Sequence, residues 1–308
     1  MADLYSIDEL ITAHHQALNF SWLTPSRPGR LPSIATMTYW VGKYTPEHHH
    51  AIEIIHRHNL PLFEQSLQQN ALYLTTGNTS TQPSLIIFAD EVSCASNTLA
   101  AVQQLGIAAL HSPMPARQIL RELAYTLAER GAHQTRHGVM LSICGQGIFL
   151  AGNSGIGKSA IALELLARGH RLVADDAPLL HHIPDSRQVY ALCPPMLADM
   201  LEVRALGILN VCKLFGPKAS VALMPVDLVI ELVEASNSDA YQRLQPYSKP
   251  TNILGVDIPS RQIPIRHTAN LALIVETLTK NHVLYNEGYD ASVILTQRQQ
   301  QLLDKQTI

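Results

Sequence analysis

Residues 152–159 have the composition and spacing of a phosphate-binding loop. They read Gly152-Asn153-Ser154-Gly155-Ile156-Gly157-Lys158-Ser159 and match the pattern GxxxxGK[ST] at every fixed position. The apolar segment 147–151 before the loop is typical of a strand, and the pattern at 160–168 after it is typical of a helix. Such a strand–loop–helix unit points backbone N–H groups and the positive end of the helix dipole at a phosphate. A glycine-rich turn that fits by chance is the alternative, and both flanking elements argue against it.

The chemistry of this loop predicts a nucleoside triphosphate bound with magnesium. The lysine of such a loop, here Lys158, reaches the β- and γ-phosphates, and the hydroxyl of Ser159 contacts the magnesium ion. We therefore expect ATP and Mg²⁺ at residues 152–159. The identity of the group that receives the phosphate has to come from other residues.

Two adjacent aspartates, Asp175 and Asp176, end a predicted strand at 171–174 shortly after the loop. Adjacent carboxylates repel each other, so one should titrate at a higher pH than the other unless a cation lies between them. This difference favours two roles, one acid near the metal and the other as a base. An Asp-Asp turn that caps the next segment is the alternative, and proximity to the phosphate loop favours the catalytic interpretation.

The composition indicates a globular protein of two ordinary domains. The chain has 308 residues, 46% hydrophobic and 15% charged, and a net charge of −3, which gives no electrostatic argument for nucleic acid or an anionic membrane as partner. Its acidic first residues do not form a signal peptide, and no apolar run approaches the ~18 residues of a membrane helix. Four scattered cysteines favour buried thiols over disulfides. We expect a soluble, cytoplasmic protein.

The first 130 residues alternate between strand and helix patterns. A continuous apolar run at 84–89, a helix at 97–105 and a short strand at 107–110 predict a parallel α/β sheet. An amphipathic helix at 119–129 closes this part. We therefore place an N-terminal α/β domain at 1–130.

The remaining residues, 131–308, predict a second domain built around the phosphate loop. A hairpin at 139–151 leads into the loop, further strands are expected at 228–233 and 263–265, and a helix is expected at 271–281. The polar tail from residue 297 is expected to be peripheral.

Histidines are frequent, 15 in all, and five of them fall within a predicted helix at 47–58. His49, Glu53 and His56 would share one face of that helix and could hold a metal ion. A solvated polar face is the favoured alternative, because imidazoles without fixed supporting groups seldom form a selective metal site.

Several segments in a fixed order resemble the HPr kinase/phosphorylase family. After the segments that carry the phosphate loop and the two aspartates, a second block resembles the signature of that family. These segments are 137–139, 152–159, 162–165, 168–176, 193–197, 201–211 and 214–216. The phosphate loop alone is generic, whereas the loop, the paired aspartates and the signature together are specific. The resemblance extends over essentially the whole chain.

The resemblance implies both an activity and an architecture. Members use ATP and Mg²⁺ to phosphorylate a seryl residue of HPr, the phosphocarrier of the sugar phosphotransferase system. They also reverse the reaction by phosphorolysis, in which orthophosphate attacks the phosphoserine and pyrophosphate leaves. The implied architecture is an N-terminal domain like that of MurF ligases, a C-terminal P-loop kinase domain like phosphoenolpyruvate carboxykinase, and a homohexamer.

The resemblance also implies roles for individual residues. Asp176 corresponds to the base that takes the serine proton, and His137 to the active-site histidine of the family. Ser159 and Glu202 correspond to magnesium ligands, and Arg243 matches an arginine that neutralises charge on the transferring phosphoryl group. For Arg243, an ordinary surface arginine is the alternative.

The chain departs from the family pattern at several positions. Asn153 and Ala160 stand where acids are usual, and Ala205 stands where glycine is usual. Thr268 and Ala269 replace a glycine and an arginine in a segment associated with phosphorolysis, and residues 217–223 lack the usual basic side chains. We therefore predict a working kinase with weakened phosphorolysis. The alternatives are a nucleotide-binding regulator with little catalysis and a kinase for another substrate.

Overall fold

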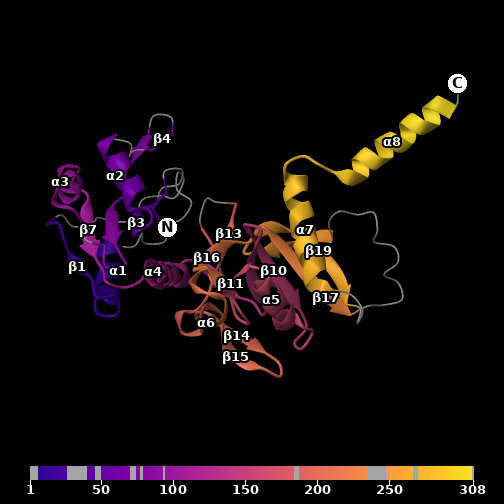
Figure 1. The fold of residues 1–308 in the computed structure, drawn as a ribbon, viewed down its shortest axis with the longest axis horizontal. Helices are drawn as coiled ribbons and strands as arrows, with labels where there is room; N and C mark the ends of the chain where they lie inside the picture. The colour runs from indigo at the N-terminus through magenta and orange to yellow at the C-terminus, as the bar shows by residue number, and fades with distance from the viewer. Residues whose placement is uncertain are drawn as a thin grey trace. The chain divides into compact units, whose positions relative to one another are not determined.

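The computed structural model describes residues 6–25, 40–45, 50–69, 74–76, 79–92, 94–183, 187–234, 248–265 and 270–306. The chain forms two compact units (Figure 1). Unit 1 comprises Met1–Thr135 and Leu179–Met196, and unit 2 comprises Arg136–Pro178 and Leu197–Ile308. The architecture is mixed α/β in both, as the sequence predicted.

A five-stranded sheet with the order β1-β7-β6-β3-β2 forms the centre of unit 1. Four of its strands are parallel, and β1 pairs antiparallel to β7 at one edge. The strands are β1 (Ser21–Trp22), β2 (Val41–Lys43), β3 (Ile52–Ile55), β6 (Leu85–Phe88) and β7 (Ala108–His111). The helices of this unit are α1 (Ile7–His14), α2 (Leu60–Gln68), α3 (Ser96–Gln104) and α4 (Ala116–Arg130). A small hairpin, β4 (Leu74–Thr76) with β5 (Thr79–Thr81), completes the part that precedes β8.

The predicted helix at 47–58 is wrong, because the described part of this segment forms the strand β3. Ile52, Ile54 and Ile55 are all fully buried, and β3 lies between β2 and β6. β-Branched side chains pack well on both faces of a central parallel strand. Glu53 is also fully buried and His56 follows the strand, so these residues do not share a helical face. His49 lies outside the described residues.

Unit 1 also contains a hairpin from the middle of the sequence. β12 (Leu179–His182) pairs antiparallel with β13 (Val189–Leu192) and with β8 (Ala132–Thr135). The sequence suggested one boundary at residues 130 and 131, whereas the chain passes between the units three times. Pairing between strands far apart in sequence leaves no local signal, so the hairpin could not be assigned to this unit in advance.

A six-stranded sheet with the order β11-β9-β10-β17-β19-β18 forms unit 2. The three strands β10, β17 and β19 are parallel, and the others pair antiparallel. The strands are β9 (Val139–Ile143), β10 (Gln146–Gly152), β11 (Arg171–Ala174), β17 (Leu228–Glu234), β18 (Ser248–Ile253) and β19 (Val256–Ile265). A core of buried aliphatic side chains joins this sheet to helices α5 (Lys158–Ala167) and α7 (Leu271–Asn286).

Shorter elements complete unit 2. The hairpin of β14 (Met200–Val203) and β15 (Gly207–Asn210) precedes helix α6 (Val211–Phe215), the short helix η3 (Pro217–Ala219) and strand β16 (Leu223–Pro225). Helix α8 (Ala291–Gln306) follows α7, and over 291–302 its side chains are exposed apart from the half-buried Ile294. The polar tail is thus helical as well as peripheral. Within the described residues, no helix is long and apolar enough to span a membrane.

The four cysteines form no disulfide, as the sequence predicted, but most of them are not buried. Cys193 is buried, Cys94 and Cys212 are half-buried, and Cys144 is exposed. The expectation of buried thiols therefore holds for Cys193 alone among the four. The exposed Cys144 lies in the turn between β9 and β10.

Candidate active site

A cavity of about 660 Å³ in unit 2 brings the phosphate loop and the acidic residues together. Its wall comes from the phosphate loop, the aspartates that follow β11, the end of strand β14, and His137. The lining residues are His137, Ser154, Gly155, Gly157, Lys158, Ser159, Ala160, Asp175, Asp176, Glu202, Val203 and Arg204.

Two glycines give the loop its shape. Gly152 ends β10 with φ of 140°, and a Cβ atom there would lie 2.7 Å from the carbonyl oxygen of Leu232. Gly157 has φ of 105° and forms the N-cap of α5. Side-chain-bearing residues rarely adopt such φ values, so the loop can turn directly from strand to helix only with glycine at these positions.

Lys158 is the first residue of α5 and is buried. Its Nζ donates hydrogen bonds to the carbonyl oxygens of Gly152 (2.8 Å) and Asn153 (3.0 Å), and it lies 3.0 Å from Nε2 of His137. Burial lowers the pKa of Lys158, and the nearby aspartates oppose that shift. The ammonium group is held inside the loop by neutral partners that a phosphate could replace.

His137 connects Lys158 to Asp176. Its Nδ1 lies 2.6 Å from Oδ1 of Asp176, while its Nε2 faces the Lys158 ammonium group. Because an ammonium group can only donate, Nε2 must accept, and the proton of a neutral imidazole is therefore on Nδ1. That N–H donates to Asp176. The three side chains form one continuous hydrogen-bonded chain along the cavity.

The two aspartates have different environments. Asp175 is buried, accepts from the Glu202 backbone N–H at Oδ2 (2.8 Å) and accepts from Ser159 Oγ at Oδ1 (3.4 Å). The Asp176 side chain is 67% exposed, and its backbone has φ of 64°. Burial raises the pKa of Asp175, and the charge of Asp176 adds to that shift. The sequence predicted an unequal pair from mutual repulsion, but desolvation is the larger cause.

The cavity offers the oxygen donors that a hard divalent cation prefers. Ser159 Oγ and Asp175 Oδ1 are adjacent, and Glu202 lines the same cavity. Hydroxyl and carboxylate oxygens of this kind suit Mg²⁺, which retains several waters and takes few protein ligands. The residues present therefore fit the metal that the sequence predicts.

Most residues predicted from the sequence meet at this cavity. His137, Lys158, Ser159, Asp176 and Glu202 all line it, and so do three further residues of the phosphate loop. Gly152, Asn153 and Ile156 belong to the loop but do not line the cavity wall. Arg243 lies outside the described residues.

Two charged lining residues have no individual role in the sequence prediction. Asp175 is predicted only as one member of a pair with Asp176, and Arg204 has no predicted role. Arg204 directly follows β14 and is two residues from Glu202, so its proximity to a predicted magnesium ligand is a usable signal. It adds a positive charge to the wall of the cavity.

Comparison with known proteins gives the same family as the sequence motifs. The family described as HPr Serine kinase C-terminal domain matches residues 127–299. The HPr kinase/phosphorylase of Xanthomonas campestris pv. campestris (strain B100) is 36% identical over 231 residues, which cover 73% of this chain and 72% of that protein. The HPr kinase/phosphorylase of Stenotrophomonas maltophilia (strain K279a) is 35% identical over 230 residues, with the same coverage.

The chain belongs to the HPr kinase/phosphorylase family. This confirms the resemblance seen in the sequence and makes the protein a phosphotransferase of the kinase class. A solved structure of the Hpr(Ser) kinase/phosphatase from Coxiella burnetii is also similar, with 37% identity, 53% of this chain and 98% of that chain covered, and a TM-score of 0.48. The family match begins within α4 and ends within α8, so it includes every residue of the cavity.

Proposed function

We propose that the protein is an ATP- and Mg²⁺-dependent kinase that phosphorylates a seryl residue of HPr. The observation that carries this proposal is the hydrogen-bonded chain from Asp176 through His137 to Lys158. A protein that only bound a nucleotide would need the phosphate loop and its lysine, but not a carboxylate joined to them. The curated relatives, which are named HPr kinase/phosphorylase, support the choice of HPr as substrate.

In the proposed reaction, the Asp176 carboxylate accepts the proton of the serine hydroxyl as the oxygen bonds to the γ-phosphorus. The bond between that phosphorus and the β,γ-bridging oxygen breaks, and ADP leaves. A serine hydroxyl is a weak nucleophile, and an exposed carboxylate at the mouth of the cavity can reach it without rearrangement. His137 fixes the carboxylate by donating from Nδ1, so the free oxygen Oδ2 remains for the incoming hydroxyl.

The other lining residues would stabilise charge on the nucleotide. Lys158 would exchange its two loop carbonyl partners for phosphate oxygens when ATP enters, which restores full pairing of a buried charge. Ser159, Asp175 and Glu202 would hold Mg²⁺. When bound, that ion neutralises charge on the phosphate oxygens. Arg204 and, from the family resemblance, Arg243 would add positive charge.

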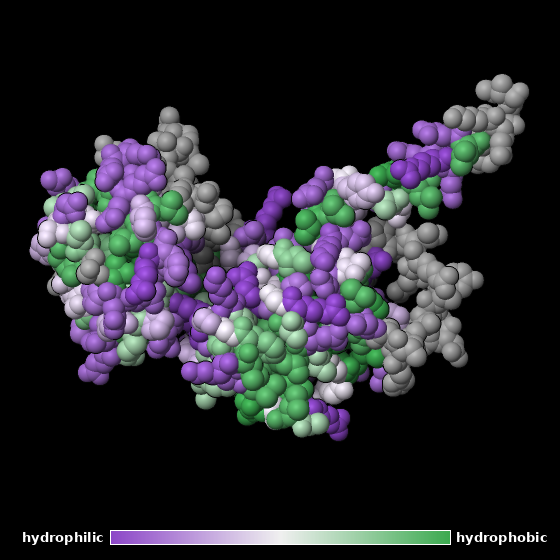
Figure 2. Space-filling view, viewed as in Figure 1, coloured by the Kyte–Doolittle hydropathy of each residue, from purple (hydrophilic) through white to green (hydrophobic). Residues whose placement is uncertain are grey.

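An exposed apolar surface next to the cavity is the proposed docking site for HPr. The hairpin β14–β15 and helix α6 expose Leu206, Ile208, Leu214 and Phe215, with Ile208 72% exposed. Figure 2 shows this hydrophobic area over β14, β15 and α6. Exposed apolar areas of this kind mark protein interaction sites. Because β14 also carries Glu202, and Arg204 follows the strand directly, a partner bound here would lie beside the phosphate site.

Phosphorolysis is part of the proposal in a weakened form. The replacements at Thr268 and Ala269 fall outside the described residues, so this prediction depends on the sequence alone. Robust release of pyrophosphate from phosphorylated HPr and orthophosphate would contradict it. The homohexamer and the likenesses to MurF ligases and phosphoenolpyruvate carboxykinase also stay predictions.

The decisive test is transfer of the labelled γ-phosphate of ATP to purified HPr, compared with the Asp176→Asn variant. Loss of a general base should slow transfer by about 10²- to 10⁴-fold. Affinity for ATP should change little, because Asp176 is exposed and does not contact the loop backbone in the hydrogen bonds described.

Asp227→Asn is a matched control, since Asp227 contacts Gly147 in unit 2 away from the cavity. Equal transfer by wild type and Asp176→Asn would reject the assigned base, and no transfer to HPr by wild type would favour another substrate or a regulatory role.

A further inference from the structure

Three potential metal ligands meet at the end of unit 2 opposite the phosphate loop. Cys144 lies in the turn that begins β10, whereas the phosphate loop follows the other end of that strand. His170 lies between α5 and β11, and Glu276 lies on α7. One ligand atom from each residue, a thiol sulfur, a ring nitrogen and a carboxylate oxygen, lies within 4.8 Å of the other two.

Cys144 occupies a backbone position that does not favour cysteine. Its φ is 52°, and Gly145 after it has φ of 83°. Ile143 pairs with Gln146, so Cys144 and Gly145 between them form the tight turn of the β9–β10 hairpin. Such turns favour Asn, Asp or Gly, because both central residues need positive φ. The side chain is exposed and free, so packing does not explain a thiol at this position.

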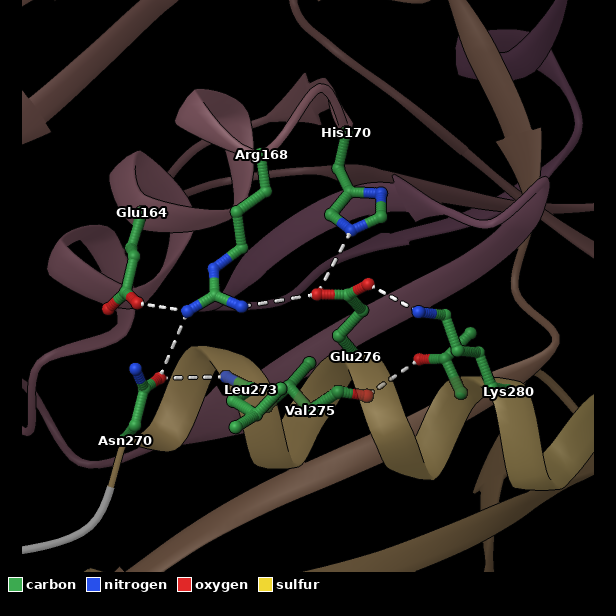
Figure 3. A network of polar contacts seen from close by, with 9 residues as sticks. Glu164, Arg168, His170, Asn270, Leu273, Val275, Glu276 and Lys280 are labelled. Carbon is green, nitrogen blue, oxygen red and sulfur yellow. Dashed lines mark hydrogen bonds and ion pairs between the residues drawn. The ribbon is translucent and has the colours of Figure 1, made fainter.

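His170 presents a buried nitrogen without a hydrogen-bond partner. The side chain is 11% exposed, and among the residues that the structure describes Nε2 accepts or donates no hydrogen bond. The nearest carboxylate oxygen, Oε2 of Glu276, is 3.8 Å away (Figure 3). Burial lowers the pKa of this histidine. A neutral imidazole at physiological pH has a lone pair available for a metal ion.

The two carboxylate oxygens of Glu276 differ in the length of their hydrogen bonds. Oε1 accepts from Lys280 Nζ at 2.6 Å, whereas Oε2 is 3.4 Å from Arg168. Arg168 makes its shorter bond, 2.6 Å, to Glu164 (Figure 3). The Lys280 hydrogen bond is the main cause of a lowered pKa at Glu276, so the carboxylate is charged at neutral pH. Oε2 is therefore a charged oxygen that faces His170 without a short partner.

We propose that Cys144, His170 and Glu276 bind a thiophilic divalent cation of the zinc class, separate from the magnesium at the phosphate loop. A thiolate and a carboxylate together balance the two positive charges of the ion, and the neutral imidazole adds a third ligand. Zinc–ligand distances of 2.0–2.3 Å place tetrahedral ligand atoms about 3.3–3.8 Å apart, so the cluster needs only small side-chain shifts. A water would take the fourth position. Lys280 would orient the carboxylate from the other side, as outer hydrogen-bond partners of metal ligands do.

Binding would join three parts of unit 2 that are far apart in sequence. The β9–β10 hairpin, the α5–β11 connection and α7 each supply one ligand. An ion that binds only the folded arrangement stabilises it, and the stabilisation grows with the logarithm of the ion concentration once that concentration exceeds Kd. The expected role is therefore to fix α7 against the phosphate-loop strand and helix, away from the reacting groups.

The test is titration of the full-length, metal-stripped protein with Co²⁺ in excess Mg²⁺. Magnesium occupies the oxygen site at the phosphate loop, while a thiolate ligand to cobalt produces an intense charge-transfer absorption that oxygen ligands do not. We expect this absorption to saturate at one ion per chain and to disappear on addition of Zn²⁺. It should be absent from Cys144→Ser, and His170→Gln should weaken binding by more than the about 10- to 100-fold typical of changes to outer partners.

Cys212→Ser is the matched control, because Cys212 is in no disulfide and lies in the same unit outside the cluster. It should keep the absorption and the affinity of the wild type. Zn²⁺ should also raise the thermal midpoint of wild type and Cys212→Ser but not of Cys144→Ser. The proposal fails if wild type gives no thiolate absorption, if Cys144→Ser retains it, or if His170→Gln binds as tightly as wild type.

Discussion

The two ends of helix α5 hold charged side chains in opposite ways. At its start, the hydrogen bonds described for Lys158 go to two carbonyl oxygens and an imidazole, and those described for the buried Asp175 come from backbone N–H groups and a hydroxyl. At its end, Arg168 lies between Glu164 and Glu276, and Lys280 completes the ion pairs. Charges without opposite partners cost free energy in the protein alone, and a ligand can compensate them. The charges at the first end therefore suit the proposed nucleotide, whereas those at the second end hold α5 and α7 together.

Removal of Lys158 should have the largest effect at the ligand-binding end. Lys158→Ala deletes the ammonium group that would pair with the phosphates, and charge-assisted hydrogen bonds contribute about 1.5–3 kcal/mol each. Affinity for MgATP should fall by about 100-fold or more when two such bonds are lost. Isothermal titration calorimetry measures this directly. An affinity within about threefold of wild type would contradict the assignment of the loop.

The pH dependence of stability should separate the two aspartates. Burial raises the pKa of Asp175 above its ordinary value of 3.8, so the folded state favours the protonated acid. The stability from this group is present below pH 3.8 and is lost as the pH rises through the raised pKa. In the absence of nucleotide and metal, Asp175→Asn should show a smaller loss of stability between pH 4 and pH 7 than wild type. Thermal midpoints across that range test this, and Asp176→Asn serves as the exposed control.

Ala205→Gly should stabilise the hairpin beside the cavity by a smaller amount. Ala205 has φ of 74° in the loop between β14 and β15, a conformation that costs an alanine about 1–2 kcal/mol. Glycine removes that cost but gains freedom in the unfolded chain, so we expect a net gain of about 1 kcal/mol. Chemical denaturation measures the change. An equal or lower unfolding free energy would show that the methyl group packs usefully.

Lys280→Ala should have the smallest effect of the series. The side chain is 59% exposed, and ion pairs at exposed positions contribute little to stability. We expect a slight decrease in thermal midpoint and no change in MgATP affinity or in transfer to HPr. A loss of MgATP affinity comparable to that expected for Lys158→Ala would show that the two ends of α5 are functionally coupled.

Much of this site could be predicted from sequence because its signals are local. The phosphate loop, its strand and its helix are contiguous, and Asp175 and Asp176 follow directly after the next strand, β11. The unequal burial of the two aspartates could not be predicted. The hairpin whose Glu202 N–H donates to Asp175 lies beside it in space but is remote in the sequence. The positive φ of Ala205 is likewise visible only in the folded loop.

The fold was predictable where strands and helices follow one another, and less so where isolated patterns were ambiguous. The isoleucines at 52, 54 and 55 within a polar, histidine-rich segment predicted a helix. They are instead buried on both faces of a strand. Short apolar runs carry both patterns, and the neighbouring strands β2 and β6 decide between them.

The three passages of the chain between the units have a consequence for any attempt to divide the protein. They fall after Thr135, Pro178 and Met196, and each lies within six residues of His137, Asp176 or Glu202. A fragment that starts at Arg136 would retain β12 and β13, both almost entirely buried, while removing their neighbour β8. The kinase half is thus not an exchangeable module, because recombination or truncation at residue 135 would remove β8 and leave an open, aggregation-prone sheet edge on β12.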